Sequence, residues 1–181
     1  MTTRRARDDH GVAVVEFALV LPILIVLMLG MFTGAMAWNQ SQALGQGARI
    51  AARAGSTMPR PVPTEAQTQT QVDTLWLDGL IDRALGASEG HMPTTITGRL
   101  VCVALVDPNG TDPDTTISRT LTGTTTRTNS TTECFNDGQG DTATRVQVVL
   151  QRDGRIDTGL YRIPLTIRRT AVYRYEADGG L

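Results

Sequence analysis

The feature that most constrains this chain is an uncharged apolar run near its N-terminus. The stretch from Phe17 to Trp38, 22 residues long, has no charged side chain. A helix needs about 20 mainly apolar residues to cross a bilayer core of about 30 Å. The run therefore predicts one membrane-spanning helix, because the apolar stretch of a buried helix in a soluble protein is normally shorter.

The arginines around this run predict its orientation. Three precede the span and two follow it closely: Arg4, Arg5 and Arg7 before, and Arg49 and Arg53 after. Basic residues favour the cytoplasmic side, so we expect a single-pass protein with its N-terminus inside and its C-terminal domain outside. The formal net charge of the chain is −1 and no basic patch dominates, which argues against a nucleic-acid partner.

A single carboxylate, Glu16, stands at the start of the apolar run. An acidic side chain at the centre of a membrane helix costs about 2.5–3.5 kcal/mol, and such residues are usually functional. The alternative is an interfacial residue whose carboxylate reaches the membrane edge. A secretory signal peptide cleaved after Ala37 is a further alternative, although its apolar region is normally about 7–15 residues long.

Glu16 also stands at a fixed distance from Gly11, with four residues between them. A short basic leader, a glycine, four residues, a glutamate and an apolar helix resemble the class III signal of type IV pilins and pseudopilins. The string GVAVVEFALVLP (residues 11–22), with ARIAARA (residues 48–54) after the span, resembles the TadE-like family of minor pilins of Tad/Flp-type systems. The closing segment LTIRRTAVYRYE (residues 165–176) is similar to the C-terminal strand of that family.

The resemblance implies how the chain is processed and assembled. A prepilin peptidase would cut after Gly11 on the cytoplasmic side of a bacterial membrane and leave Val12 as the first residue. Glu16, then the fifth residue, would meet the new α-amine of a neighbouring subunit during assembly. The implied partners are the peptidase, other pilin subunits, pilus assembly proteins and the lipid bilayer.

The pattern beyond the span predicts four parts. Residues 1–11 form the leader, 12–54 the membrane helix and its extension, 55–63 a linker rich in proline, and 64–181 an extracytoplasmic domain. Thr64 and Gln67 match a capping box that opens a helix ending at Gly86. Its apolar stripe, at the spacing of helical turns, predicts core packing: Val72, Trp76, Leu77, Leu80, Ile81 and Leu85.

Three strands are expected after this helix. Residues 99–106 are almost continuously apolar and suit a central strand, residues 144–151 alternate between apolar and polar, and residues 164–175 read as one extended strand with Pro164 at its start. They favour an antiparallel sheet with a helix across one face. The expected fold class is α+β, a long N-terminal transmembrane helix followed by a head with a helix and a small antiparallel sheet, as in pilins.

A long polar connection, residues 107–142, separates the first two strands and carries eleven threonines between Thr111 and Thr132. We expect a solvated loop; a sugar-bearing surface or a contact surface for other pilus components is the alternative. Cys102 and Cys134 flank much of this stretch, and an even pair of cysteines suits an oxidising exterior. We expect them to form a disulfide, with a buried Cys102 and an unrelated thiol at Cys134 as the alternative.

The sequence offers no catalytic constellation. The two histidines are far apart, and no phosphate-binding loop, nucleophile elbow or C-x-x-C motif occurs. Two groups of side chains with oxygen ligands lack a full calcium-loop spacing: Asp107, Asn109, Asp112 and Asp114 in one, and Asp137 and Asp141 in the other. We therefore expect no enzyme, metal site or cofactor, but a minor pilin or pseudopilin subunit; the alternative is a permanently anchored extracytoplasmic binding or sensing domain.

Overall fold

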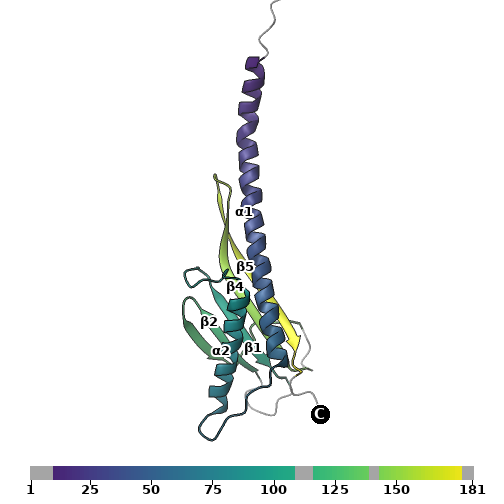
Figure 1. Ribbon diagram of the computed structural model, residues 1–181, viewed down its shortest axis with the longest axis vertical. Helices are drawn as coiled ribbons and strands as arrows, with labels where there is room; N and C mark the ends of the chain where they lie inside the picture. The colour runs from purple at the N-terminus through teal and green to yellow at the C-terminus, as the bar shows by residue number, and fades with distance from the viewer. Residues whose placement is uncertain (1–9, 109–115, 139–142, 177–181) are drawn as a thin grey trace, which may run out of the picture.

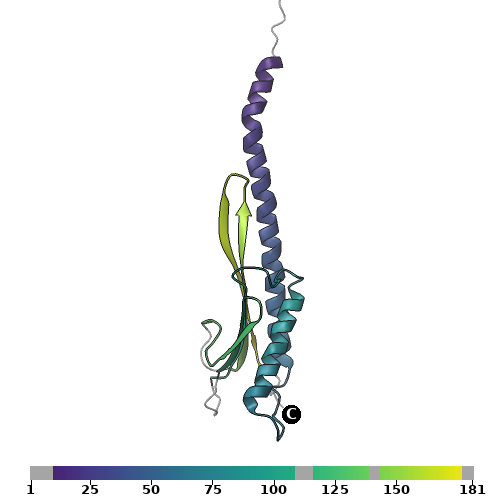
Figure 2. The same ribbon diagram turned by 90° about the vertical axis from the view of Figure 1, so that its left-hand side faces the viewer.

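One long helix runs through the molecule and carries a compact head on its C-terminal half (Figure 1). The computed structural model describes residues 10–108, 116–138 and 143–176. The long helix is α1 (His10–Thr57, 48 residues), and the shorter α2 (Gln69–Ala87) lies beside its lower half. Turned by 90°, the head shows two layers, with the sheet on one side and both helices on the other (Figure 2).

The second layer is a five-stranded antiparallel sheet in the order β3-β2-β1-β4-β5. Its members are β1 (Leu100–Val106), β2 (Thr116–Thr122), β3 (Thr126–Ser130), β4 (Arg145–Asp157) and β5 (Arg162–Arg174). In the register, Val103 of the central strand β1 faces Arg119 of β2 on one side and Val148 of β4 on the other. The expected α+β class, with its antiparallel sheet, is confirmed.

The expectation that residues 107–142 form a connection without strands is wrong. The hairpin β2–β3 lies inside this stretch and extends the sheet beyond β1. Threonine is β-branched and fits a pleated, half-buried surface, so a threonine-rich segment can pair as a strand even with few apolar residues. Gly123, at φ +64°, supplies the left-handed turn that closes the hairpin.

The element boundaries shift by a few residues from those expected. Thr68 caps α2, and its side chain and that of Gln71 form the capping box, four residues after the expected pair. Strands β4 and β5 are each longer than expected and join through a turn at residues 158–161. Pro164 therefore lies inside β5, which is tolerated because β5 is an edge strand.

The C-terminal half of α1 packs against the rest of the head through a face of small residues. This face is buried and consists of Ser41, Ala43, Leu44, Gly47, Ala48, Ala51, Ala52, Gly55 and Ser56. A Cβ atom on Gly47 would lie 2.6 Å from the carbonyl oxygen of Ala84 in α2, and one on Gly55 would lie 2.8 Å from Leu80 Cδ1. Two helices and the sheet therefore meet too closely for a larger side chain at these positions.

Arginine–carboxylate pairs fasten α2 to the segment after α1 and to the sheet. Arg60, in the segment after α1, forms two hydrogen bonds with the buried Asp73 at 2.9 and 2.7 Å. Asp78 binds Arg119 of β2 at 2.5 Å and Arg127 of β3 at 2.7 Å.

Burial alone would raise the pKa of Asp78, but the hydrogen bonds and charges of the two arginines outweigh this effect and lower the pKa below its usual range. The ionised carboxylate of Asp78 therefore stabilises the fold at a pH above the pKa that Asp78 has in the unfolded chain. This contribution is lost as the pH falls through the pKa of Asp78 in the folded protein.

Two glycine-to-alanine substitutions should have opposite effects on stability. Gly79, exposed in α2, has open space around its missing Cβ, so Gly79→Ala should stabilise the chain by roughly 0.5–1 kcal/mol through helix propensity. Gly47→Ala gains the same propensity but forces α1 away from Ala84, so it should destabilise by about 1–3 kcal/mol. Denaturant unfolding of the full chain in detergent measures both; equal stabilisation by the two would contradict the close approach of α1 and α2.

Candidate functional site

The N-terminal half of α1 projects beyond the head and exposes its apolar side chains. Met28 and Met31 are each 75% exposed, and Leu19 is 70% exposed. Residues 13–57 include a window of mean hydropathy 2.7 of which nothing is buried inside the molecule. In the described part of the chain, this is the one helix long and apolar enough to cross a membrane, and it is compatible with membrane anchoring.

Glu16 lies on this exposed half of α1, and Gly11 and Val12 lie in its first turns. The side chain of Glu16 is exposed, and no hydrogen bond or ion pair joins it to another described residue. A helix rises 1.5 Å per residue, so Glu16 lies about 6 Å along the axis from Val12. The carboxylate is therefore available to a group on another molecule at nearly the level where the helix begins.

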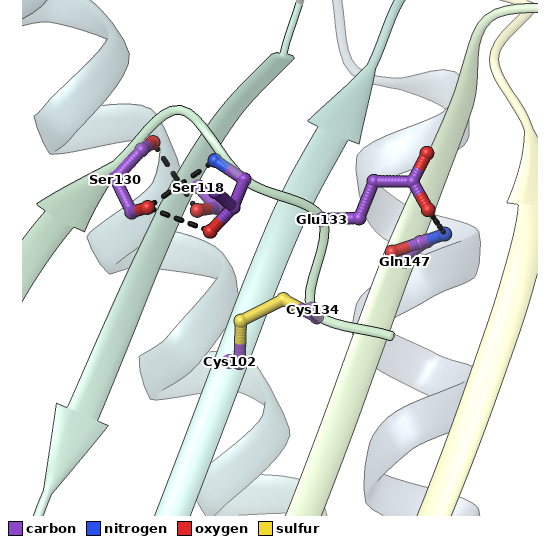
Figure 3. Close-up of a disulfide and its surroundings, with 7 residues drawn as sticks. Cys102, Ser118, Ser130, Glu133, Cys134 and Gln147 are labelled. Carbon is purple, nitrogen blue, oxygen red and sulfur yellow. Dashed lines mark hydrogen bonds between the residues drawn. A yellow bond between two sulfur atoms is a disulfide. The ribbon is translucent and has the colours of Figure 1, made fainter. Parts of the chain in front are cut away.

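The second unusual feature is a segment that crosses the face of the sheet turned away from the helices (Figure 3). We call residues 131–138 the cover segment. Cys134 of the cover segment forms a disulfide with Cys102 of β1, and the two Cα atoms are 5.8 Å apart, within the range of bonded cysteines. The expected pairing is thus present in the structure, and it holds the cover segment against the central strand.

The cover segment buries polar side chains of β4. Arg145 and Gln147 lie on the polar side of this alternating strand, yet Arg145 is 5% exposed and Gln147 is fully buried. Asp137 accepts hydrogen bonds from Arg145 Nε at 2.6 Å and from Gln147 Nε2 at 2.7 Å, and Glu133 accepts one from Arg145 Nη2 at 3.2 Å. A charged pair is taken out of water here, so its hydrogen bonds must be retained for the cover segment to stay closed.

The acidic residues considered for calcium are otherwise engaged or lie outside the described residues. Asp137 binds Arg145 and Gln147, and Asp107 accepts a hydrogen bond from Thr144 Oγ1 at 2.9 Å. Asn109, Asp112, Asp114 and Asp141 are not among the described residues. Within the described ranges, no group of three or more potential metal ligands comes together.

Comparison with known proteins gives one match. Residues 11–53 match the family model described as TadE-like protein. This segment is TadE-like. The resemblance inferred from Gly11, Glu16 and the apolar helix is thereby confirmed, and it suggests a protein associated with the Tad pilus. Neither a curated protein nor a solved structure matches the chain in two further comparisons.

The TadE-like segment coincides with nearly all of α1, from the first turn to a point four residues before its end. It includes the exposed half and the part of the small-residue face from Ser41 to Ala52, whereas Gly55 and Ser56 lie beyond it. The similarity of residues 165–176 to a family strand lies outside the match and stays a prediction. In the structure these residues belong to β5, and Arg169 of β5 donates a hydrogen bond to Ser41 Oγ of α1 at 2.8 Å. The TadE-like helix and the final strand are therefore in direct contact.

Removing the disulfide should open the cover segment before it unfolds the head. In the Cys102→Ala/Cys134→Ala variant, we expect a loss of roughly 3–4 kcal/mol of unfolding free energy from the loop-entropy model, with measured values often lower. Hydrogen exchange should rise first in residues 131–138, since Arg145 and Gln147 then have access to water. Gly79→Ala serves as a control that leaves the cover segment intact; unchanged exchange at residues 131–138 in the cysteine variant would contradict this role.

Proposed function

We propose that this protein is a minor pilin or pseudopilin subunit that takes part in the assembly of a Tad/Flp-type pilus. In this proposal α1 anchors the precursor in the cytoplasmic membrane of a bacterium, with the N-terminus inside and the head outside. The role is structural rather than enzymatic, and its partners are other pilin subunits, pilus assembly proteins and a prepilin peptidase.

The observation that carries this proposal is the division of one TadE-like helix into two halves. The half after residue 40 is built into the head by a face of small residues, and the half before it exposes almost every apolar side chain. An exposed apolar half can lie in lipid before assembly and against neighbouring helices afterwards, because both surroundings are apolar. The same half of the helix is therefore suited both to the membrane-anchored precursor and to the assembled subunit.

Glu16 supports the proposal through its position and its lack of a partner within the described chain. After cleavage behind Gly11, the α-amine would begin at Val12, about 6 Å along the axis from Glu16. A neighbouring subunit displaced along the axis by about this distance would bring its amine level with Glu16. In an apolar medium an ammonium and a carboxylate attract strongly, and either one left alone is penalised.

The alternative, a permanently anchored binding domain, predicts a different N-terminus. A plain anchor has no reason to lose its leader, whereas a pilin precursor must lose it before assembly. The state of the N-terminus therefore separates the two functions.

Cleavage after Gly11 is the first test. We expect the mature protein from a host with a prepilin peptidase to begin at Val12, and Gly11→Leu to block this maturation because a bulky side chain replaces the residue before the cut. N-terminal sequencing and mass spectrometry measure both results. Gly34→Leu is the matched control, since Gly34 lies in the same helix with open space around it; a mature chain starting at Met1 or Trp38 would reject the proposal.

Glu16 is the second test, because it should matter for assembly more than for insertion. Glu16→Ala and Glu16→Gln should insert at least as well as the wild type, since a charge in lipid is costly. Their recovery with other pilins in a pull-down should fall about tenfold or more, equivalent to at least about 1.4 kcal/mol. Val15→Ala, which alters the neighbouring exposed residue without changing charge, is the control. Equal recovery of the Glu16 variants and the wild type would rule out the assembly role.

A further inference from the structure

The hairpin β4–β5 extends well beyond the other strands and rises beside α1 (Figures 1 and 2). Its pairing with β1 ends at Gln151, and from Arg152 to Asp157 strand β4 pairs only with β5. The base of the hairpin is fixed, because the buried Arg152 donates to the carbonyl of His91 at 2.5 Å and the amide of Asp153 donates to Thr97 at 3.0 Å. We call residues 155–163 the hairpin tip.

The hairpin tip reaches a defined level on α1. A Cβ atom on Gly159 would lie 3.2 Å from Leu29 Cδ1, and one on Gly30 would lie 3.9 Å from Thr158 Cγ2. Leu29 and Gly30 belong to the uncharged run that ends at Trp38, eight residues later. If the hydrocarbon core extended to Trp38, the tip would be immersed by about 12 Å.

Immersion of the tip is physically unfavourable. Strand β5 is an edge strand, and an open sheet edge does not occur in the hydrocarbon region because its backbone groups would lose water without gaining partners. Arg155 and Arg162 on the two strands are exposed, and each would carry a charge into lipid. The hydrocarbon core must therefore end near Leu29.

A core that ends near Leu29 still fits the helix. Residues 12–29 comprise 18 residues and span about 27 Å, within the range that crosses a bilayer. Glu16 then lies about 6 Å from the inner edge of this span. Its carboxylate is consequently near the headgroups, where its cost is smaller than at the bilayer centre.

The side chains of the hairpin tip suit a membrane surface. Leu160 is 71% exposed and Tyr161 is 74% exposed, and tyrosine prefers the level of the lipid headgroups. Arg162 binds Asp157 through Nε at 3.1 Å, which leaves its terminal guanidinium nitrogens without a partner among the described residues. Arginine pairs well with phosphate, and basic residues are attracted to anionic lipids.

We propose that the hairpin tip rests on the outer surface of the membrane that α1 crosses. Leu160 and Tyr161 lie in the headgroup layer, and Arg155 and Arg162 face lipid phosphates. This inference rests on the membrane anchoring in the proposed function, and it adds a second point of contact that fixes the depth of the helix and the tilt of the head.

Depth-dependent quenching of a fluorescent label tests the inference on the full chain in vesicles of phosphatidylcholine and phosphatidylglycerol. Both native cysteines are in the disulfide, so one introduced cysteine gives one labelling site. We expect the label in Leu160→Cys to be quenched mainly by a headgroup spin probe, and the label in Leu24→Cys mainly by a mid-chain probe. Leu75→Cys on α2, where the native side chain is 65% exposed, is the matched control and should show neither effect.

The three positions separate the possible failures. If the label at position 24 is quenched from mid-chain and the label at 160 behaves like the one at 75, the tip does not touch the membrane and only this inference fails. Quenching of the label at 160 from mid-chain would also overturn it, because the tip would then be immersed. A label at position 24 that no lipid probe quenches would overturn the membrane anchoring itself.

Discussion

The close approach of α1 to α2 and β4 is the contact on which the rest of the head depends. At Gly47 the missing Cβ leaves room for the carbonyl of Ala84, and at Gly55 it leaves room for Leu80 and Val146. The two glycines lower intrinsic helix propensity, yet they allow one face of a 48-residue helix to join the core of the head. The opposite end of the same helix carries larger apolar side chains, and these are exposed. A single helix can therefore be half core and half exposed because its residue sizes change along its length.

Arginine compensates for a head with few aromatic residues, which make up 4% of the chain. The sequence has 17 arginines and no lysine, and the planar guanidinium group of arginine can bind a carboxylate through two nitrogens. Arg60 holds Asp73 in this way, Arg119 and Arg127 share Asp78, and Arg145 of β4 holds Asp137 of the cover segment. Each pair joins two different segments of the head, and those of Asp78 join α2 to strands about 40 or more residues further along the chain. The pairs therefore supply part of the cohesion that large apolar residues give in other proteins. The disulfide performs the same task on the outer face of the sheet.

The sequence predicted those elements whose signal is local. The apolar run, the stripe from Val72 to Leu85 and the strands near residues 100, 145 and 165 each follow from composition and periodicity, and the motif of Gly11 and Glu16 led to the family. The hairpin β2–β3 was missed because threonine and arginine gave no apolar alternation, although β-branching favours strands. The burial of Arg145 and Gln147 could not be foreseen, since it depends on a cover segment brought back by a disulfide. The level of the hairpin tip on α1 likewise depends on strand length and register, which no local pattern encodes.

In the proposed membrane-anchored form, Glu16 and the hairpin tip together limit how α1 can lie in a bilayer. The carboxylate needs to be near the inner edge, and the open strand edge needs to be outside the outer edge. Residues 12–29, a rise of about 27 Å, then match a core of about 30 Å, with Glu16 about 6 Å inside its inner edge and the hairpin tip at its outer edge. The carboxylate of Glu16 makes such a span less favourable in lipid than one that is apolar throughout. In the proposed function the subunit leaves the membrane, and this arrangement would favour that step because Glu16 would gain its counter-charge only in the assembled state.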